Sequence, residues 1–410
     1  MSASPATPVH ASYRALFAQP VLRRLAVADV CARLPQGMTS ITLLLVAAQH
    51  ASMTVAGLVV AGYTLGQAVT APLRGRLADR HGLLPVAVIC GTGYALALLA
   101  LLASSLARGP AGLLISTASL AGLVNPPLSP GMRSLWSTYA GVRLAHAAFA
   151  LDAAVFDLAY ITGPVLASVL AVGAAPAAAL AVLLTLTGAA IIAIGKQPSH
   201  HPPSHHASPG RLGPLRSAAL RELLVTAALA NVALTATEVA LTAYVRHHHA
   251  LWASGPLLAE VSIGSILGSL LFGARGAAPG AHPYRRLPWL MAGYACGLAV
   301  LTVAGLYAPL LAVAAPLAGL CLGPTLASLF GAAASAAPPG AGTETQAWIN
   351  SIMNGGAAGG AALAGLTSGR PILALALGAT AAVAAAGSAA TTAARHRPDL
   401  AGLDLPGGLS

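Results

Sequence analysis

The stretch Gly75-Arg76-Leu77-Ala78-Asp79-Arg80-His81-Gly82 separates two long apolar segments, residues 54–73 and 84–107. Each of these segments holds about the 20 residues that one helix needs to cross the hydrocarbon core of a bilayer. The glycines at the two ends of the stretch permit a tight turn, and the charges between them favour contact with water. We therefore predict a short polar loop between two membrane-spanning helices.

The composition of the whole chain agrees with this interpretation. Hydrophobic residues make up 57% of the 410 residues and charged residues only 8%, whereas about 25% of the residues of a soluble globular protein are charged. So few charges exclude a water-facing surface of this size, and they also exclude a disordered chain. Four cysteines exclude a disulfide scaffold. The remaining class is a membrane protein that crosses the bilayer many times.

Twelve candidate spans are found between the polar breaks. They are residues 21–48, 54–73, 84–107, 110–130, 145–172, 174–195, 221–246, 252–274, 287–308, 309–335, 344–369 and 371–393. A count of eleven is the alternative, because only Tyr307, Ala308 and Pro309 separate the ninth span from the tenth. The first span is too long for a cleaved signal peptide and contains charged residues.

The basic residues predict the orientation of these spans. Seventeen of the 21 Lys and Arg residues fall on one predicted side, and only Arg108, Arg246 and Arg370 fall on the other. The seventeen are Arg14, Arg23, Arg24, Arg74, Arg76, Arg80, Arg133, Arg143, Lys196, Arg211, Arg216, Arg221, Arg275, Arg285, Arg286, Arg395 and Arg397. Since cytoplasmic loops carry the excess of basic residues, we predict a multi-pass protein of the plasma (inner) membrane with both termini in the cytoplasm. This distribution also explains the net charge of +11 without a nucleic-acid partner.

One long polar break divides the chain near its middle. It is rich in His, Pro and Ser, as expected of a flexible linker. We predict an N-terminal six-helix bundle over residues 1–195, a cytoplasmic linker over 196–218, a C-terminal six-helix bundle over 219–395 and a cytoplasmic tail over 396–410. Two six-helix halves are typical of secondary transporters with internal repeats.

The stretch between the second and third spans resembles the signature loop of the major facilitator superfamily. The resemblance is carried by Gly75, Asp79, Arg80 and Gly82, and the sequence departs from the pattern at Leu83 and Leu84, where basic residues are usual. It implies an all-α fold of twelve transmembrane helices in two pseudo-symmetric halves. It also implies that Asp79, capping the next helix or pairing with a basic residue of another helix, belongs to a gate that breaks when the cavity opens inward.

A second resemblance lies in the fifth span. Gly163 and Pro164, preceded by Ala159, are similar to a motif of the antiporters in this superfamily. This resemblance favours export of the drug or metabolite efflux type. The alternative is ordinary close packing, because small residues let helices approach one another.

Buried acids are the candidates for proton coupling, since a charge at membrane depth is expensive. Asp157 lies near the middle of the fifth span, and Glu238 and Glu260 lie at similar depth on the seventh and eighth spans. Glu238 has no basic residue within one helical turn in the sequence, so it is suited to take up and release a proton. The alternative for Glu238 is a hydrogen bond between helices.

Polar side chains with helical spacing on the apolar spans are the candidates for the wall of a substrate cavity. They are Asp29, Arg33, Gln36, Tyr63, Gln67, Asn231, Gln346, Trp348, Asn350 and Asn354. Asp29 and Arg33 are one turn apart, so they form either a structural ion pair or a contact to a polar substrate. The amides of the eleventh span either bind substrate or hold neighbouring helices together.

The sequence contains no Walker nucleotide loop and no pairing of a nucleophile with a base, so we expect neither an enzyme nor a cofactor. The histidine clusters 200–206 and 247–249 lie in predicted loops without an acid or cysteine at ligand spacing, so we expect no metal site. We predict a monomeric, proton-coupled exporter of a small organic compound that works by alternating access. The alternatives are proton-coupled nutrient uptake by the same fold, and a receptor or scaffold that has lost transport.

Overall fold

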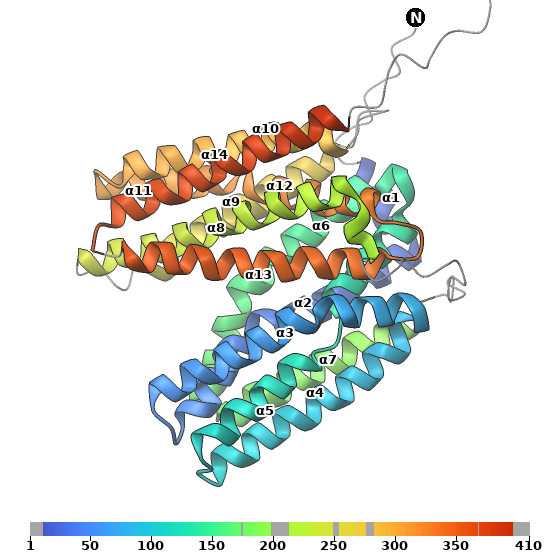
Figure 1. Cartoon of the computed structure of the whole chain (residues 1–410), viewed down its shortest axis with the longest axis vertical. Coiled ribbons are helices and arrows are strands. Elements are labelled where there is room, and N and C mark those ends of the chain that lie inside the picture. Colours follow the sequence, from blue (N-terminus) through green and yellow to red (C-terminus); the bar gives the residue numbers. More distant parts are fainter. Residues whose placement is uncertain are drawn as a thin grey trace, which may run out of the picture.

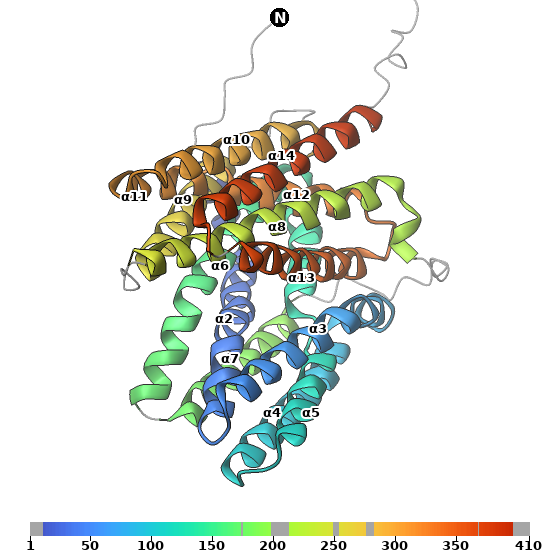
Figure 2. The same ribbon diagram turned by 60° about the vertical axis from the view of Figure 1, so that its left-hand side comes forward.

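The computed structural model describes residues 11–173, 175–197, 213–248, 254–275, 283–367 and 369–396. Its helices form two groups that lie against each other (Figures 1 and 2). After the short α1 (Ala11–Ala18), the first half contains α2 (Pro20–Ala48), α3 (Met53–His81), α4 (Leu83–Leu106), α5 (Ala111–Leu123), α6 (Leu128–Gly173) and α7 (Pro176–Gly195). The second half contains α8 (Ala218–His247), α9 (Ser254–Ala274), α10 (Pro283–Ala304), α11 (Leu311–Gly319), α12 (Leu322–Ala336), α13 (Gly342–Leu366) and α14 (Pro371–Arg395).

Both described ends of the chain lie at the same end of the bundle, which we call the terminal side. The hydroxyl of Tyr13 on α1 lies against Gly273 at the end of α9. The ring of Tyr284, at the start of α10, lies 6.0 Å from that of His396 after α14. The predicted linker and tail fall largely outside the described residues, which omit 198–212 and 397–410.

The predicted twelve-span fold is confirmed. In the described part of the chain, eleven helical stretches are long and apolar enough to cross a membrane. The remaining span is α13, which has 25 residues and packs along α3 and α8. Its first turns contain Glu344, Gln346 and Asn350, which lower its hydropathy. A 3₁₀ turn at Ala308–Leu310 separates α10, the ninth span, from the tenth span, which runs through α11 and α12 over Leu311–Ala336.

The fourth span is longer than predicted and is broken in the middle. Helix α5 stops at Leu123 because Pro126 and Pro127 lack the N–H groups that would continue its hydrogen-bond ladder. The helix resumes at Leu128 and continues to Gly141, where φ of 59° ends the span within α6. The prediction that the span ends at residue 130 was therefore wrong, because the prolines interrupt the span without ending it.

The stretch 75–82 is helical over most of its length, contrary to the predicted loop. Helix α3 continues to His81, and only Gly82, with φ of 91°, makes the turn into α4. The leucines that replace the usual basic residues lie near other helices, Leu83 at Gly131 of α6 and Leu84 at Gly195 of α7. Leu83 is partly buried there, whereas Leu84 is exposed.

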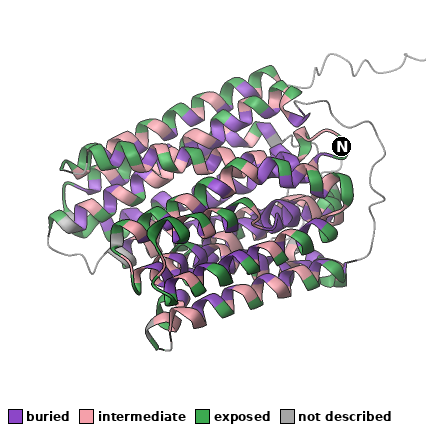
Figure 3. Cartoon of the chain, turned by 60° about the horizontal axis from the view of Figure 1, so that its bottom comes forward, coloured by how far each residue is buried: buried purple, intermediate pink, exposed green. Residues whose placement is uncertain are grey.

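Helix packing depends on small residues and leaves apolar side chains on the outside. A side chain at Gly37 of α2 would collide with the backbone of Ala159 on α6, and one at Gly319 would collide with Val261 of α9. Buried and exposed residues alternate along the helices (Figure 3). Large apolar residues such as Val69 and Ile89 are mostly exposed, as expected of a surface that faces lipid.

Candidate functional site

A cavity of about 870 Å³ lies between the two halves. Helices α2, α3, α6, α8, α9, α10, α12 and α13 contribute to its wall, together with the break between α5 and α6. Its polar lining consists of Gln36, Gln67, Arg74, Asn125, Ser129, Asp157, Tyr160, Asn231, Thr235, Thr237, Glu238, Ser262, Tyr294, Asn350 and Asn354. A cavity of this size matches the usual volume of a small-molecule site.

The structure brings about half of the predicted polar residues to this cavity. The predicted residues that line it are Gln36, Gln67, Asp157, Asn231, Glu238, Asn350 and Asn354, joined by Pro164 of the antiporter-like motif. The predicted residues that are absent from its wall are Asp29, Arg33, Tyr63, Glu260, Gln346 and Trp348. The first group comes from five helices and both halves, so one cavity unites residues more than 300 positions apart in the sequence.

Two carboxyl groups, one from each half, face the cavity. Asp157 of α6 is 7% exposed, while Glu238 of α8 is exposed where it lines the cavity. The two groups are close enough to interact electrostatically, and the hydroxyl group of Tyr294 on α10 lies within range of both. The cavity therefore contains a cluster of two acids and one phenol at the interface of the halves.

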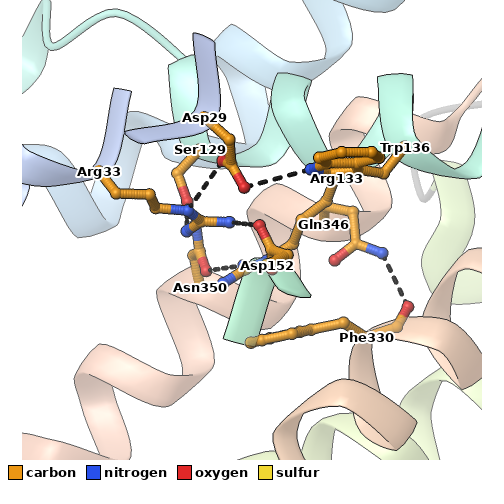
Figure 4. A network of polar contacts seen from close by, with 9 residues as sticks. All are labelled: Asp29, Arg33, Ser129, Arg133, Trp136, Asp152, Phe330, Gln346 and Asn350. Carbon is orange, nitrogen blue, oxygen red and sulfur yellow. Dashed lines mark hydrogen bonds and ion pairs between the residues drawn. The ribbon is translucent and has the colours of Figure 1, made fainter. Parts of the chain in front are cut away.

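A fully buried ion network (Figure 4) adjoins this cavity, because its arginines contact Ser129 and Asn350 of the cavity wall. Arg33 of α2 donates from Nε to Oδ1 of Asp29 at 3.3 Å and also contacts Ser129 and Asp152 of α6. Arg133 donates from Nε to Oδ2 of Asp152 at 3.1 Å. All four charged side chains are 0% exposed. Two guanidinium groups and two carboxylates balance each other, as burial of charge requires.

The network also connects the two halves of the protein. Nη1 of Arg133 donates to Oδ1 of Asn350 on α13 at 2.7 Å. The guanidinium carbon of Arg133 lies 3.4 Å from the ring centroid of Phe330 on α12, whose carbonyl accepts a hydrogen bond from Nε2 of Gln346 at 3.0 Å (Figure 4). Asn350 therefore contacts both the cavity and the network.

Sequence reasoning placed Arg133 in a cytoplasmic loop, and the structure corrects this. The extension of the fourth span to Gly141 carries Arg133 into the protein, and Trp136 one turn further donates from Nε1 to Oδ2 of Asp29 at 3.1 Å. Arg74, also assigned to a loop, is 5% exposed on α3. The tryptophan one turn after Arg133 was the available signal, since the pair has helical spacing in a segment with no other charged residue.

On the terminal side, the signature stretch closes the two halves against each other. The carboxylate of Asp79 accepts hydrogen bonds from the backbone N–H groups of Thr343 at 2.9 Å and Glu344 at 2.8 Å. Arg76 donates from Nε and Nη2 to the two carboxylate oxygens of Glu344 at 3.0 and 2.6 Å. Asp79 thus caps the N-terminus of α13, where the helix dipole favours a negative charge. Arg80 is exposed.

Three other predicted residues, Gly163, Tyr63 and Trp348, pack against other parts of the protein. The backbone at Gly163 packs on that at Gly37 of α2, which agrees with the close-packing alternative for this part of the fifth span. Tyr63 lies 6.4 Å from the ring of Tyr94 in the first half. Trp348 packs on the apolar core of the second half. Within the described residues, no three His, Cys, Asp or Glu side chains are grouped as ligands of a metal ion.

Two six-helix halves that enclose a polar cavity define a secondary transporter. The sequence model of the Major Facilitator Superfamily matches residues 25–361, and the chain belongs to this family. No curated protein matches the sequence.

Solved structures with this fold cover nearly the whole chain. A bacterial homologue of the iron transporter ferroportin in an outward-facing state has a TM-score of 0.77 at 12% identity, over 92% of this chain and all of that one. The human organic anion transporter MFSD10 has a TM-score of 0.73 at 15% identity, over 90% and 100% of the two chains. The fucose:proton symporter of E. coli has a TM-score of 0.69 at 13% identity, over 91% and 98%. At these identities the likeness concerns the fold alone.

Proposed function

We propose that this protein is a proton-coupled exporter of a small organic compound that works by alternating access. The observation that carries the proposal is the position of Asp157 and Glu238, which come from different halves and line one cavity. A carboxyl group at this interface changes its charge when it binds a proton, and relative movement of the halves changes the side from which the group is reached. Protonation of the carboxyl group is thereby linked to the side of the membrane from which the cavity is reached.

The contacts on the terminal side supply the second part of this mechanism. Opening the cavity toward the terminal side requires that Arg76 separates from Glu344, and that Asp79 leaves the N-terminus of α13. The contact of Arg133 with Asn350 must also break. These are polar contacts between the halves that can form again in each transport cycle. With the terminal side in the cytoplasm, the conformation described here is closed to the cytoplasm.

Export rather than uptake is favoured by the resemblance of Gly163 and Pro164 to the antiporter motif; Pro164 lines the cavity, while Gly163 packs closely on α2. We further propose that the protein lies in the plasma (inner) membrane and acts as a monomer, since one chain provides the whole cavity wall described above. Proton-coupled uptake by the same fold is the competing function.

Proton release from inside-out vesicles tests the proposal. The interior of the vesicles is acidified, and each member of a compound panel is added in turn. A fluorescent pH indicator reports whether protons then leave the vesicles. We expect a compound-triggered efflux with the wild type that is lost in Glu238→Gln. Glu222→Gln is the matched control, because it removes a carboxylate from the same helix where that group pairs with Arg395 at 2.7 Å, away from the cavity.

The possible results separate the candidate functions. Full coupled transport by Glu238→Gln would contradict the assigned role of Glu238. Compound-driven proton movement of the opposite sense, with accumulation of the compound in whole cells, would establish uptake. Substrate flux without proton movement would refute the coupling, and no flux over a broad panel in either assay would favour the receptor or scaffold.

A further inference from the structure

We propose that the cavity binds an organic ammonium group beside Asp157. We call this part of the cavity the ammonium site and define it by Phe156, Asp157, Tyr160, Glu238 and Tyr294. The inference rests on the proposed function, because the ammonium compound is the transported substrate. It assigns a chemical class to that substrate.

The first observation is an unsatisfied carboxylate. Asp157 is more than nine-tenths buried and lines the cavity. In the described part of the chain, no group forms a hydrogen bond of normal geometry with its Oδ2 atom, although the hydroxyl group of Ser265 on α9 lies close to the carboxylate. A buried carboxylate oxygen without a partner is costly. A ligand with N–H donors and a positive charge removes that cost by forming a charge-assisted hydrogen bond.

The second observation is the aromatic wall beside this carboxylate. The rings of Phe156 and Tyr160, one helical turn apart on α6, lie 4.5 Å from each other. Tyr160 is 52% exposed although it lies at membrane depth, and it lines the cavity, as does Tyr294 on α10. Aromatic faces attract cations electrostatically, and more strongly where water is excluded. A carboxylate among tyrosine rings therefore recognises an ammonium group by two independent interactions.

The third observation is that acidic groups outnumber basic groups on the cavity wall. Arg33 is 0% exposed and pairs with Asp29 and Asp152, so its charge does not face the cavity. Its guanidinium carbon lies 5.7 Å from the ring centroid of Phe156. Arg74 lines the cavity, where its Nη2 donates to the carbonyl of Gln67 at 2.9 Å and its buried Nε has no hydrogen-bond partner among the described residues. The cavity wall thus carries two carboxyl groups against one guanidinium group, and this excess of acidic groups favours a cationic ligand over an anionic one.

The rest of the cavity fits a compound that is polar at more than one point. The amides of Gln67, Asn125, Asn231 and Asn354 line the wall and offer both donors and acceptors. Apolar side chains, among them Leu234 and Leu298, complete the lining. An amine with an aromatic or aliphatic body and one or two polar substituents matches this wall.

Binding to the purified full-length protein in lipid nanodiscs tests the site. The probes are 2-phenylethylamine, the neutral 2-phenylethanol and the anionic 3-phenylpropionate, followed by a panel of secondary, tertiary and quaternary amines. Calorimetry gives the Kd of each probe. We expect the amine to bind at least about tenfold more tightly than the neutral analogue, since one charge-assisted hydrogen bond separates them, and we expect no binding of the anion.

Single substitutions show which side chains contribute to amine binding. Asp157→Asn should weaken amine binding about tenfold or more. Tyr160→Leu should weaken it several-fold, whereas Tyr160→Phe, which keeps the ring, should retain it. Glu222→Gln should leave binding unchanged. Thermal unfolding of each variant in the nanodisc shows whether it has kept its fold.

Two results would overturn the inference. One is equal binding of the amine by the wild type and a folded Asp157→Asn variant. The other is failure of the entire amine panel to bind a wild-type protein that unfolds cooperatively. Proton-coupled transport of a neutral or anionic compound by Asp157→Asn would refute the ammonium site and leave the proposed function intact. Amine binding without any proton movement would refute the coupling and leave the ammonium site intact.

Discussion

Arg76 and Glu344 pair across the interface of the two halves, although 268 positions separate them in the sequence. Two parallel hydrogen bonds join the guanidinium group of α3 to the carboxylate at the start of α13. Glu344 is 2% exposed and its backbone N–H also donates to Asp79. The signature stretch and the polar start of α13 therefore form one closure on the terminal side.

Removal of the carboxylate that caps α13 is predicted to open this closure. Asp79→Ala removes two charge-assisted hydrogen bonds, each of which contributes about 1.5–3 kcal/mol. A loss of this size shifts a conformational equilibrium at least about tenfold. Distances between spin labels at the exposed positions His81 and Arg221, in a background without the native cysteines, should report a population with a wider terminal side. Lys196→Gln, an exposed change at the same end, is the control, and an unaltered distance distribution in Asp79→Ala would contradict the assigned closure.

The buried network is predicted to tolerate loss of a pair better than loss of one charge. Arg33→Gln leaves Asp29 and Asp152 with a single guanidinium partner and should cost about 3 kcal/mol of stability, because an unpaired charge stays buried. The double variant Asp29→Asn with Arg33→Gln keeps the balanced pair of Asp152 and Arg133, and it should cost less. Denaturation in detergent micelles compares the two proteins. A double variant less stable than the single would show that charge balance is not what holds the network.

Close packing of α2 on α6 is predicted to exclude any side chain at Gly37. The added methyl group of Gly37→Ala meets the carbonyl group of Ala159, and such overpacking costs about 1–3 kcal/mol. Gly188 of α7 has open space where its side chain would be, so Gly188→Ala should be neutral or stabilising. Thermal stability of the two purified variants distinguishes these positions. Similar melting temperatures would mean that the two helices can separate at no cost.

The orientation of the protein is predicted by its basic residues and can be checked with topology reporters. Alkaline phosphatase, which is active only outside the cytoplasm, should be inactive when fused after Ser410 and active when fused after Arg108. Fluorescent protein fusions at the same positions should give the opposite pattern. Active phosphatase at the C-terminus would reverse the predicted orientation and, with it, the side to which the described conformation is closed.

Residues of the cavity wall were predictable from the sequence where the 3.6-residue period of a helix alone decides which way a side chain points. Gln36, Asn231 and Asn350 lie on polar faces of apolar helices, and the structure turns all three to the cavity. Arg33 and Asp29 lie on the same face as Gln36 in the sequence pattern, yet they are enclosed by α6. Helical periodicity shows on which side of its own helix a side chain lies. It does not show which neighbouring helix packs against that side.

Sequence alone determined that this chain is a membrane protein of two halves with eleven or twelve spans, because bilayer thickness and the cost of buried charge act on each segment separately. Only the tertiary structure decided that Arg133 is a buried partner of Asp152 and Asn350, and that Asp79 caps a helix of the other half. It also decided that Asp157 and Glu238 share one cavity. The physical reason is that these contacts depend on how separate helices pack across the two halves, and no local pattern of residues encodes that arrangement.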